Sequence, residues 1–404
     1  MTEATANRTR SAPGHLTLTV GPGRGDLQGS DDKALQAGVE YLQRLGGGIL
    51  QVLPGQYEMR NALYLRPGVT LRGSGPDTVL HKTPSVCSAL VQDSDWYENR
   101  VTVADAAGFT AGCGLMLRTY RGGHLHEVVK RTVVEVRGND LVLDRRLLRN
   151  SWLEEQATAA TLFPILTAVE GVCGVRVESL VLDGDGGHNE EVNGNYAGAV
   201  FLQECDRITF SEVVARNYNG DGYSFQVCDD VRFESCRAED NANLGFHPGS
   251  GSQRPLFRDC VSRGNAQGIF FCWGVADGLV DGCECCDNRD FGISIGHRDT
   301  DNRVVRTRIV GNHKVGLLFR EQTEFRGPHR NLVELCEIGD NGFAAEGVGL
   351  DVRGRAEDNV VRNCRFADSG AGRQKIGVRL GPDSRNTQLT ANTFAGLARD
   401  VEEL

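Results

Sequence analysis

The sequence predicts an all-β fold, a solenoid of short parallel strands stacked coil upon coil. Three residue columns recur in step along the second half of the chain, and repeats in the twenties are typical of solenoids. The first column spaces asparagines at 24, 24, 23, 24 and 29 residues: Asn217, Asn241, Asn265, Asn288, Asn312 and Asn341. The second is mostly cysteine: Cys236, Cys260, Cys283, Thr307, Cys336 and Cys364. The third is a glycine that opens a strand: Gly222, Gly245, Gly268, Gly292 and Gly316.

Each column has a physical reason. Asparagine suits a stacked turn because it bonds local backbone and tolerates a left-handed conformation. Cysteine suits a narrow interior because its side chain is small and apolar. We therefore interpret the cysteines as core residues rather than as disulfides or metal ligands. The Cys-x-x-Cys at Cys283 and Cys286 has no second pair at zinc-ribbon spacing, and no metal is predicted there.

The N-terminal part begins with an amphipathic helix. Asp31 or Asp32 can cap it, Leu35, Val39 and Leu42 share one face, and glycines 46–48 end it. Short strands follow at ILQVL (49–53), ALYL (62–65) and VTLRG (69–73). This block resembles the N-terminal cap and first coils of pectin-lyase-like right-handed β-helix proteins. The resemblance implies a right-handed parallel β-helix whose helix plugs one end of the core, and we assign residues 14–97 to this cap and the first coils.

Residues 98–150 break the repeat. VTVADAAGFTAGCGLMLRTY and TVVEVRGNDLVLDRRLL alternate in polarity around a Gly-Asn-Asp turn. They predict a small inserted β subdomain, which either covers a substrate or is purely structural. Residues 151–404 are assigned to the main coils.

Composition limits the partners. A net charge of −10 and a pI near 5.5 argue against nucleic acid as the main partner. Residues 1–15 lack an apolar signal-peptide core, and no apolar run is long enough to span a membrane. We expect a cytoplasmic protein without a membrane partner. Solenoids of this type associate through their sides, so a homo-oligomer is compatible with the sequence.

Strand alternation predicts an outward face of mixed polar character. The residues assigned to it are Ser224, Gln226, His247, Phe270, Cys272, Ser294, Leu318, Arg320, Asp351 and Arg379. In the resembled superfamily this face holds extended sugar chains, so the resemblance implies a carbohydrate substrate. The basic residues of the predicted groove suggest an anionic one, such as a uronic-acid glycan.

The candidate site spans successive coils. The catalytic candidates are His247, His297, Arg320 and Asp221. The candidates for substrate binding are Gln226, Ser252, Gln253, Trp273, Arg298, Asp299, Glu321, Asp351 and Arg353. Each also has a structural interpretation as a turn residue or a surface ion pair. Convergence of His247, Trp273, His297 and Arg320 on equivalent strand regions favours the functional interpretation.

Three functional classes remain open, two catalytic and one of binding alone. β-Elimination of a uronate, the favoured class, needs a cation on the carboxylate, a base and an acid. Arg320 or Arg298 could bind the carboxylate, with His247 and His297, or a tyrosine, as acid and base. A hydrolase would need two carboxylates, drawn from Asp221, Glu204, Asp299, Glu321 and Asp351. A non-catalytic glycan-binding solenoid is the third class.

C5-epimerisation of a uronate is a further reaction, and its sequence motif can be compared with this chain. Mannuronan C5-epimerases of this fold carry GFDPH and then HGI on the next coil. The present chain is similar but has GFHPG and QGI, so His247 replaces the aspartate and Gln267 the histidine. Epimerase chemistry therefore cannot be carried over. No cofactor is assigned; Ca²⁺ stays an alternative that Asp183, Asp185 and Asp221, or Asp299 and Asp301, could bind.

Overall fold

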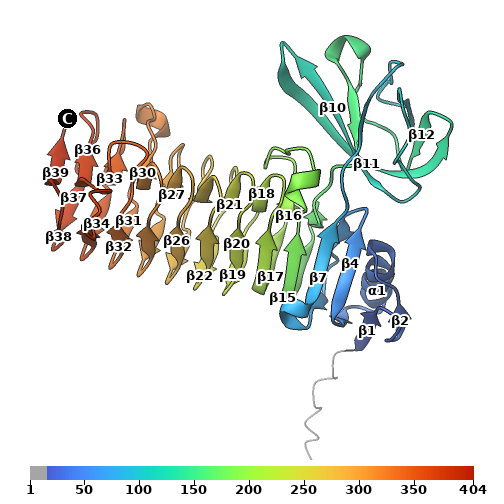
Figure 1. Cartoon of the computed structure of the whole chain (residues 1–404), viewed down its shortest axis with the longest axis horizontal. Coiled ribbons are helices and arrows are strands. Elements are labelled where there is room, and N and C mark those ends of the chain that lie inside the picture. The colour runs from blue at the N-terminus through green and yellow to red at the C-terminus, as the bar shows by residue number, and fades with distance from the viewer. Residues whose placement is uncertain (1–15) are drawn as a thin grey trace, which may run out of the picture.

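Strands of consecutive coils pair in parallel, each one repeat beyond the last, along the whole solenoid (Figure 1). The computed structural model describes residues 16–404. One eleven-stranded sheet contains, in spatial order, β5 (Leu63–Tyr64), β14 (Leu166–Val169), β16 (Gly198–Gln203), β18 (Asp221–Gln226), β21 (Leu244–Pro248), β24 (Gln267–Phe270), β27 (Phe291–Ile295), β30 (Val315–Phe319), β33 (Val348–Val352), β36 (Ile376–Leu380) and β39 (Arg399–Glu403). The predicted parallel β-helix is confirmed.

The other walls of the solenoid together form one 22-stranded sheet, because two long strands pair with strands of both walls and so connect them. These strands are β15 (Cys173–Asp183) and β17 (Asp206–Arg216). The N-terminal members are β1 (Thr17–Gly21), β2 (Leu27–Gln28), β3 (Gly48–Val52), β4 (Gly55–Met59), β6 (Val69–Arg72) and β7 (Thr78–Lys82). The later members are β19 (Arg232–Glu234), β20 (Arg237–Glu239), β22 (Leu256–Arg258), β23 (Val261–Arg263), β25 (Leu279–Asp281), β26 (Glu284–Cys286), β28 (Arg303–Val305), β29 (Arg308–Val310), β31 (Leu332–Glu334), β32 (Glu337–Gly339), β34 (Val360–Arg362), β35 (Arg365–Ala367), β37 (Gln388–Thr390) and β38 (Thr393–Ala395).

Inward-facing side chains of these strands build one continuous core. Phe233 stacks on Phe210 and Phe257, and Tyr223 stacks on Phe246, so aromatic rings pile up along the axis. The cysteine column lies in the same core, and every cysteine is a free thiol. Burial raises the pKa of Cys285 well above its usual value, as expected of an unreactive core thiol.

The asparagine column forms a buried hydrogen-bonded ladder. Each Oδ1 accepts a bond from the preceding coil, as when Asn265 donates through its backbone N–H to Asn288 at 3.1 Å. From Asn241 to Asn312, each side-chain amide donates to the next asparagine and to a backbone carbonyl, and the amide of Asn341 donates to Gln374 instead. The ladder starts at Tyr218, whose N–H donates to Asn241, while Asn217 is exposed in a left-handed turn. Asn217 thus stands one residue outside the expected column.

The N-terminal cap is the helix α1 (Asp32–Arg44). Asp31 is its N-cap, and the carboxylate accepts a bond from the N–H of Ala34 at 3.0 Å. Leu35, Val39 and Leu42 are buried against the first coil. A helix at this place covers apolar core that the solenoid would otherwise expose.

The insertion forms a separate antiparallel sheet of β8 (Cys87–Ala89), β9 (Arg100–Thr102), β10 (Gly114–Arg121), β11 (His124–Arg137), β12 (Asp140–Leu143) and β13 (Thr158–Ala160). It has a core of its own and projects from the N-terminal part of the solenoid (Figure 1). The sheet extends beyond residues 98–150 at both ends because β13 pairs with both β8 and β10.

Within the described part of the chain there are also four short 3-10 helices: Gly75–Asp77, Leu153–Glu155, Gly186–His188 and Glu324–Arg326. The first two positions of the expected domain 14–97, and the segment 1–15 used for the signal-peptide expectation, lie outside the described residues. Within residues 16–404, no helix has the length and apolar character needed to cross a membrane.

Candidate functional site

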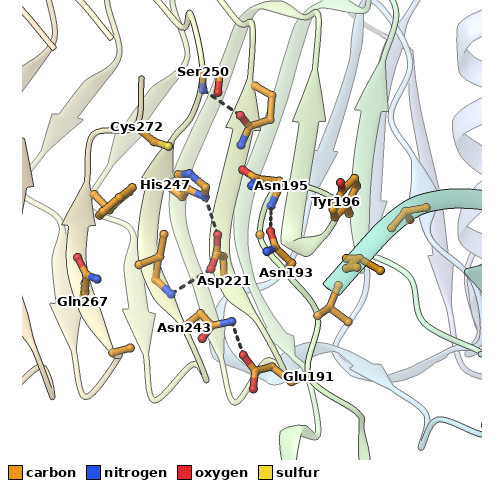
Figure 2. Close-up of a pocket in the computed structure, with 18 of the residues that line it drawn as sticks. Glu191, Asn193, Asn195, Tyr196, Asp221, Asn243, His247, Ser250, Gln267 and Cys272 are labelled. Atoms are coloured by element: carbon orange, nitrogen blue, oxygen red, sulfur yellow. Dashed lines mark hydrogen bonds and ion pairs between the residues drawn. The ribbon is translucent and has the colours of Figure 1, made fainter. Parts of the chain in front are cut away.

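A cleft of about 860 Å³ opens between the eleven-stranded sheet, the insertion and the loop that joins β15 to β16. Its floor comes from Asp221, Gln226, His247, Gln267, Phe270 and Cys272 on successive coils. Figure 2 labels four of these residues, Asp221, His247, Gln267 and Cys272. The insertion supplies Met116, Arg118, Tyr120, Leu125 and Val128, and the loop supplies residues 191–196. Asn243, Leu244, Ser250, Ala266, Trp273 and Asp290 complete the lining. The cleft is therefore built from three parts of the chain that are distant in sequence.

Asp221 and His247 form a buried ion pair at the floor. Nδ1 of His247 lies 2.7 Å from Oδ2 of Asp221, and both side chains are almost fully buried (Figure 2). Oδ1 of Asp221 accepts a bond from the N–H of Leu244 at 3.0 Å. The carboxylate is thus fixed by two partners and orients the imidazole, as in other carboxylate–histidine pairs.

The charge of His247 follows from this geometry. Burial alone would lower its pKa, but the hydrogen bond to Asp221, the neighbouring Cys272 thiol and the negative charge of Asp221 together raise the pKa to about 9. His247 is therefore an imidazolium at neutral pH. Its Nε2 is buried and has no hydrogen-bond partner among the described residues, so one N–H remains for a ligand.

Amide and aromatic side chains surround this pair. Oε1 of Gln226 accepts a bond from the N–H of Ser250 at 2.9 Å. Oε1 of Gln267 is buried without a protein partner, which leaves an acceptor for a ligand hydroxyl. The ring of Phe270 meets His247 edge-on, with ring centroids 5.7 Å apart. Amides for hydroxyl groups and rings for apolar faces are the two kinds of contact that sugars require.

Trp273 extends the cleft toward the C-terminal coils. Its side chain is 60% exposed and stacks on the imidazole of His297, with centroids 4.9 Å apart. Nδ1 of His297 lies 3.2 Å from Oε1 of Gln322. His297 therefore supports Trp273 from behind and does not line the cleft, so His247 and His297 do not face one bound group as an acid and base pair.

Arg320 and Asp299 lie in a buried network outside the cleft. Arg320 donates to Ser294 Oγ at 2.8 Å, to the carbonyl of Phe271 and to Asp299 at 3.2 Å. Asp299 also accepts bonds from the N–H groups of Gly274, Val275 and Gly296. Burial raises the pKa of Asp299, although Arg320 and these N–H groups oppose the shift. The contacts hold a turn, and neither Arg320 nor Asp299 lines the cleft.

The other predicted residues also lie outside the cleft. Ser252 is buried and accepts a bond from the N–H of Cys228, and Gln253 donates to two backbone carbonyls. Arg353 pairs with Asp351 at 2.7 Å. Arg298 is exposed on a turn, and Glu321 is exposed in the segment that follows β30. The loop after His247 contributes Ser250 instead, which stands two residues before the expected Ser252.

The basic groove expected from the sequence is not observed, because three of its arginines pair with carboxylates and Arg298 does not line the cleft. Arg320 pairs with Asp299, Arg353 with Asp351, and Arg379 with Glu346 and Glu402. The cleft itself contains one guanidinium, from Arg118, paired with Glu190 at 2.7 Å. Its Nε is buried without a partner.

The carboxylates named for Ca²⁺ do not gather. Asp183 pairs with Arg216, Asp185 contacts His188, and Asp301 pairs with Arg330. Asp221 and Asp299 are bound as described above. Across residues 16–404, no group of three or more His, Cys, Asp or Glu side chains is arranged to hold a metal ion.

Sequence reasoning missed the loop residues Glu191, Asn193, Asn195 and Tyr196. It gave a substrate-covering role as one of two expectations for the insertion but named no residue of that wall. One signal was available: the 14 residues between β15 and β16 exceed the short turns of the later coils and are rich in asparagine. Long loops on a regular scaffold often carry function. The position of the insertion over the sheet had no sequence signal, since it depends on tertiary packing.

Comparison with known proteins agrees with the geometry. Residues 198–366 match the family model described as right handed beta helix region, which confirms the handedness. No curated protein matches the chain. Among solved structures, the A-modules of the Azotobacter vinelandii mannuronan C-5 epimerases AlgE6 and AlgE4 align with TM-scores of 0.59 and 0.55 at 15% identity. Each alignment covers 92% of this chain and 91% or 95% of the other. PfbA, a surface adhesin of Streptococcus pneumoniae, aligns at 0.50 with 11% identity, covering 92% and 89%.

Proposed function

We propose that this chain, which has the right-handed parallel β-helix fold of the pectin-lyase-like superfamily, is a carbohydrate-active protein. Its cleft would bind an oligosaccharide or polysaccharide. The observation that carries the proposal is the buried Asp221–His247 pair at the floor of a cleft lined with amides and aromatic rings. His247 and Gln267, which replace the aspartate and histidine of the epimerase motif, both line this cleft. The mannuronan epimerases that share the fold act on a uronate polymer by name, which supports a uronate substrate.

The charge of His247 selects its role. An imidazolium held by a carboxylate donates a proton, so it serves a step in which a glycan oxygen gains one. In β-elimination that oxygen is the leaving glycosidic oxygen of a uronate. His247 is therefore the proposed acid. Arg118 is the proposed partner of the uronate carboxylate through its buried Nε, which has no hydrogen-bond partner among the described residues, although the same guanidinium also pairs with Glu190.

A base must remove the C5 proton. Tyr196 lines the cleft from the loop that covers the sheet, and its phenol is the candidate. Neither His297 nor Arg320 has a role in this scheme, because both are engaged outside the cleft. Hydrolysis remains the alternative class, with Glu191 and Asp290 as carboxylates that line the same cleft.

The test is incubation with a panel of uronate and neutral glycans, with ultraviolet absorbance of unsaturated products and reducing ends measured separately. The proposal predicts absorbance and reducing ends in equal amounts with a uronate polymer. Reducing ends alone would assign a hydrolase and contradict elimination. Binding without either product would reduce the function to glycan recognition, and no binding by any glycan would overturn the proposal.

A further inference from the structure

The loop that joins β15 to β16 packs directly on the Asp221–His247 pair. Its point of contact is Gly194, where a methyl group built on the Cα would lie 1.7 Å from Oδ2 and 2.8 Å from Oδ1 of Asp221. Figure 2 shows Asn193 and Asn195, which flank Gly194, beside the pair. Asp221 is 1% exposed and His247 is 4% exposed. The loop therefore leaves no room for a side chain at residue 194, and the carboxylate beneath it is closed to water.

The carboxylate cannot move aside to admit a side chain. Oδ2 of Asp221 lies 2.7 Å from Nδ1 of His247, and Oδ1 accepts a bond from the N–H of Leu244 at 3.0 Å. A shift of either oxygen would break one of these bonds and leave a buried polar group without a partner, which native structures avoid. A side chain added at Gly194 would therefore displace the loop rather than the carboxylate.

A serine beneath the loop fixes its height above the sheet. Oγ of Ser224 donates to the carbonyl of Gly194 at 2.6 Å, and Ser224 is fully buried. The same oxygen lies 3.4 Å from Nδ1 of His247 and accepts a bond from Nε2 of Gln226 at 3.3 Å. The loop, the imidazole and the amide of the floor share this one hydroxyl, so a displacement of the loop reaches the ring.

The end of the loop is held from the other side by the insertion. Nζ of Lys130, on β11, donates to the carbonyl of Tyr196 at 2.8 Å. The same Nζ lies 3.9 Å from the ring centroid of Phe201, which is buried on β16. The loop is thus held between the sheet and the insertion, with Gly194 on Asp221 and Tyr196 two residues further along the chain.

We propose that Gly194 is a positioning residue of the cleft, whose missing side chain lets the loop exclude water from the Asp221–His247 pair. A polar contact gains strength where water is excluded, because the local dielectric constant is low. The same contact sets where Tyr196 stands relative to the imidazole, since Ser224 and Lys130 hold the loop on either side of it. The exclusion of water follows from the geometry alone, whereas the effect on Tyr196 as a base rests on the proposed function.

The experiment compares Gly194→Ala with Gly187→Ala in the full chain. Gly187 lies in the same connection between β15 and β16, and a methyl group there would meet nothing within 4 Å. Neither glycine has a φ in the left-handed region, so alanine strains neither backbone. The measurement is the rate at which the Nδ1 proton of His247 exchanges with solvent, followed by NMR with isotope-labelled histidine and assigned by its absence in His247→Gln. Exchange should be at least about tenfold faster in Gly194→Ala and unchanged in Gly187→Ala, because only the first variant opens the cover over the pair.

Ser224→Ala provides a second variant, because it removes the hydroxyl that holds the Gly194 carbonyl without adding volume. Faster exchange is expected there too, and this variant decides if Gly194→Ala does not fold. The inference fails if a folded Gly194→Ala protein, or Ser224→Ala in its place, exchanges the proton at the wild-type rate. It also fails if Gly187→Ala speeds exchange equally.

Turnover tests the part that rests on the proposed function. With a glycan that the wild type converts, Gly194→Ala should lower kcat by about tenfold or more and change KM by less than about threefold, because a displaced loop misplaces reacting groups without removing a binding contact. Faster exchange with unchanged kcat would overturn the positioning of Tyr196. Exchange needs no glycan, so faster exchange in a protein whose wild type converts no glycan would support the exclusion of water and contradict the proposed reaction. Unchanged exchange with normal turnover in Gly194→Ala would overturn the inference alone.

Discussion

Nδ1 of His247 and Oδ2 of Asp221 lie 2.7 Å apart across one step of the solenoid, and the pair is almost completely excluded from water. The strand register places them there: Ser224 pairs with His247, and Asp221 begins the strand that precedes it. The proposed chemistry depends on this pair, because Asp221 fixes both the orientation and the charge of the His247 imidazole.

Removing the charge of Asp221 tests this relationship. In Asp221→Asn, burial still disfavours the imidazolium, while the carboxylate that opposed burial is gone. The pKa of His247 is expected to fall well below about 9, because Cys272 is then the one remaining group named as raising it. Titration of the ring resonances by NMR measures the shift. A pKa that stays near 9 would show that Asp221 is not the cause.

The same pair makes stability depend on pH. Because the folded pKa of His247 is raised above 6.5, its contribution is complete below pH 6.5 and is lost as pH rises toward 9. The difference in free energy of unfolding between wild type and His247→Gln should shrink across this window by about 3 kcal/mol, at 1.4 kcal/mol per pKa unit. Urea titrations at several pH values measure it, and a constant difference would refute the linkage.

The asparagine ladder predicts a large effect from one amide. Asn288 is fully buried, donates to Asn312 and to the carbonyl of Ser262, and accepts from Asn265. Asn288→Ala leaves these partners without a hydrogen bond. It should lower the free energy of unfolding by about 3 kcal/mol, since each buried unsatisfied group costs about 1–3 kcal/mol. Asn195→Ala, an exposed asparagine in the cleft loop, should change stability by less than about 0.5 kcal/mol. Equal urea midpoints for the two variants would contradict the ladder.

Arg320 is expected to stabilise the fold. Its contacts with Asp299, Ser294 and the carbonyl of Phe271 are buried, so Arg320→Ala leaves an uncompensated carboxylate and should cost about 3–5 kcal/mol. Asp299→Asn in the same background should recover part of that loss, which a double-mutant cycle measures. An Arg320→Ala protein of unchanged stability that loses glycan turnover would instead restore Arg320 as a catalytic residue.

Trp273 is expected to contribute to glycan binding and little to folding. It is 60% exposed at the end of the cleft and rests on His297. Trp273→Ala should weaken glycan binding by roughly tenfold, because stacking of an aromatic ring is worth about 1 kcal/mol or more. Phe325 is 88% exposed and does not line the cleft, so Phe325→Ala is a matched control that should leave the affinity for glycan unchanged. Calorimetric titration of both variants checks the difference.

Residue periodicity predicted much of the fold because each repeat reports the same local environment. The core cysteines, the cap over Leu35 and Val39, and the outward side of His247 all follow from spacing. A second ladder of Asn302, Asn331 and Asn359 escaped notice, although its spacing of 29 and 28 residues was in the sequence. The longer coils there had obscured the period.

The site was harder to predict because strand position does not reveal what a side chain contacts. Asp221 and His247 were chosen, and they are the residues that the structure pairs in the cleft. Arg320 and Asp299 were chosen on the same grounds, yet they bond to each other beneath a turn. The wall formed by Arg118 and Tyr120 depends on how the insertion folds over the sheet, which no periodic pattern encodes.

The most direct test of the central claim compares wild type and His247→Gln on a uronate polymer that the wild type converts. If His247 donates its proton to the glycan, the variant should bind the polymer within about threefold of wild type while kcat falls by about 100-fold or more, the range of acid–base catalysis. A His247→Gln protein that turns over the polymer at the wild-type rate would contradict the account.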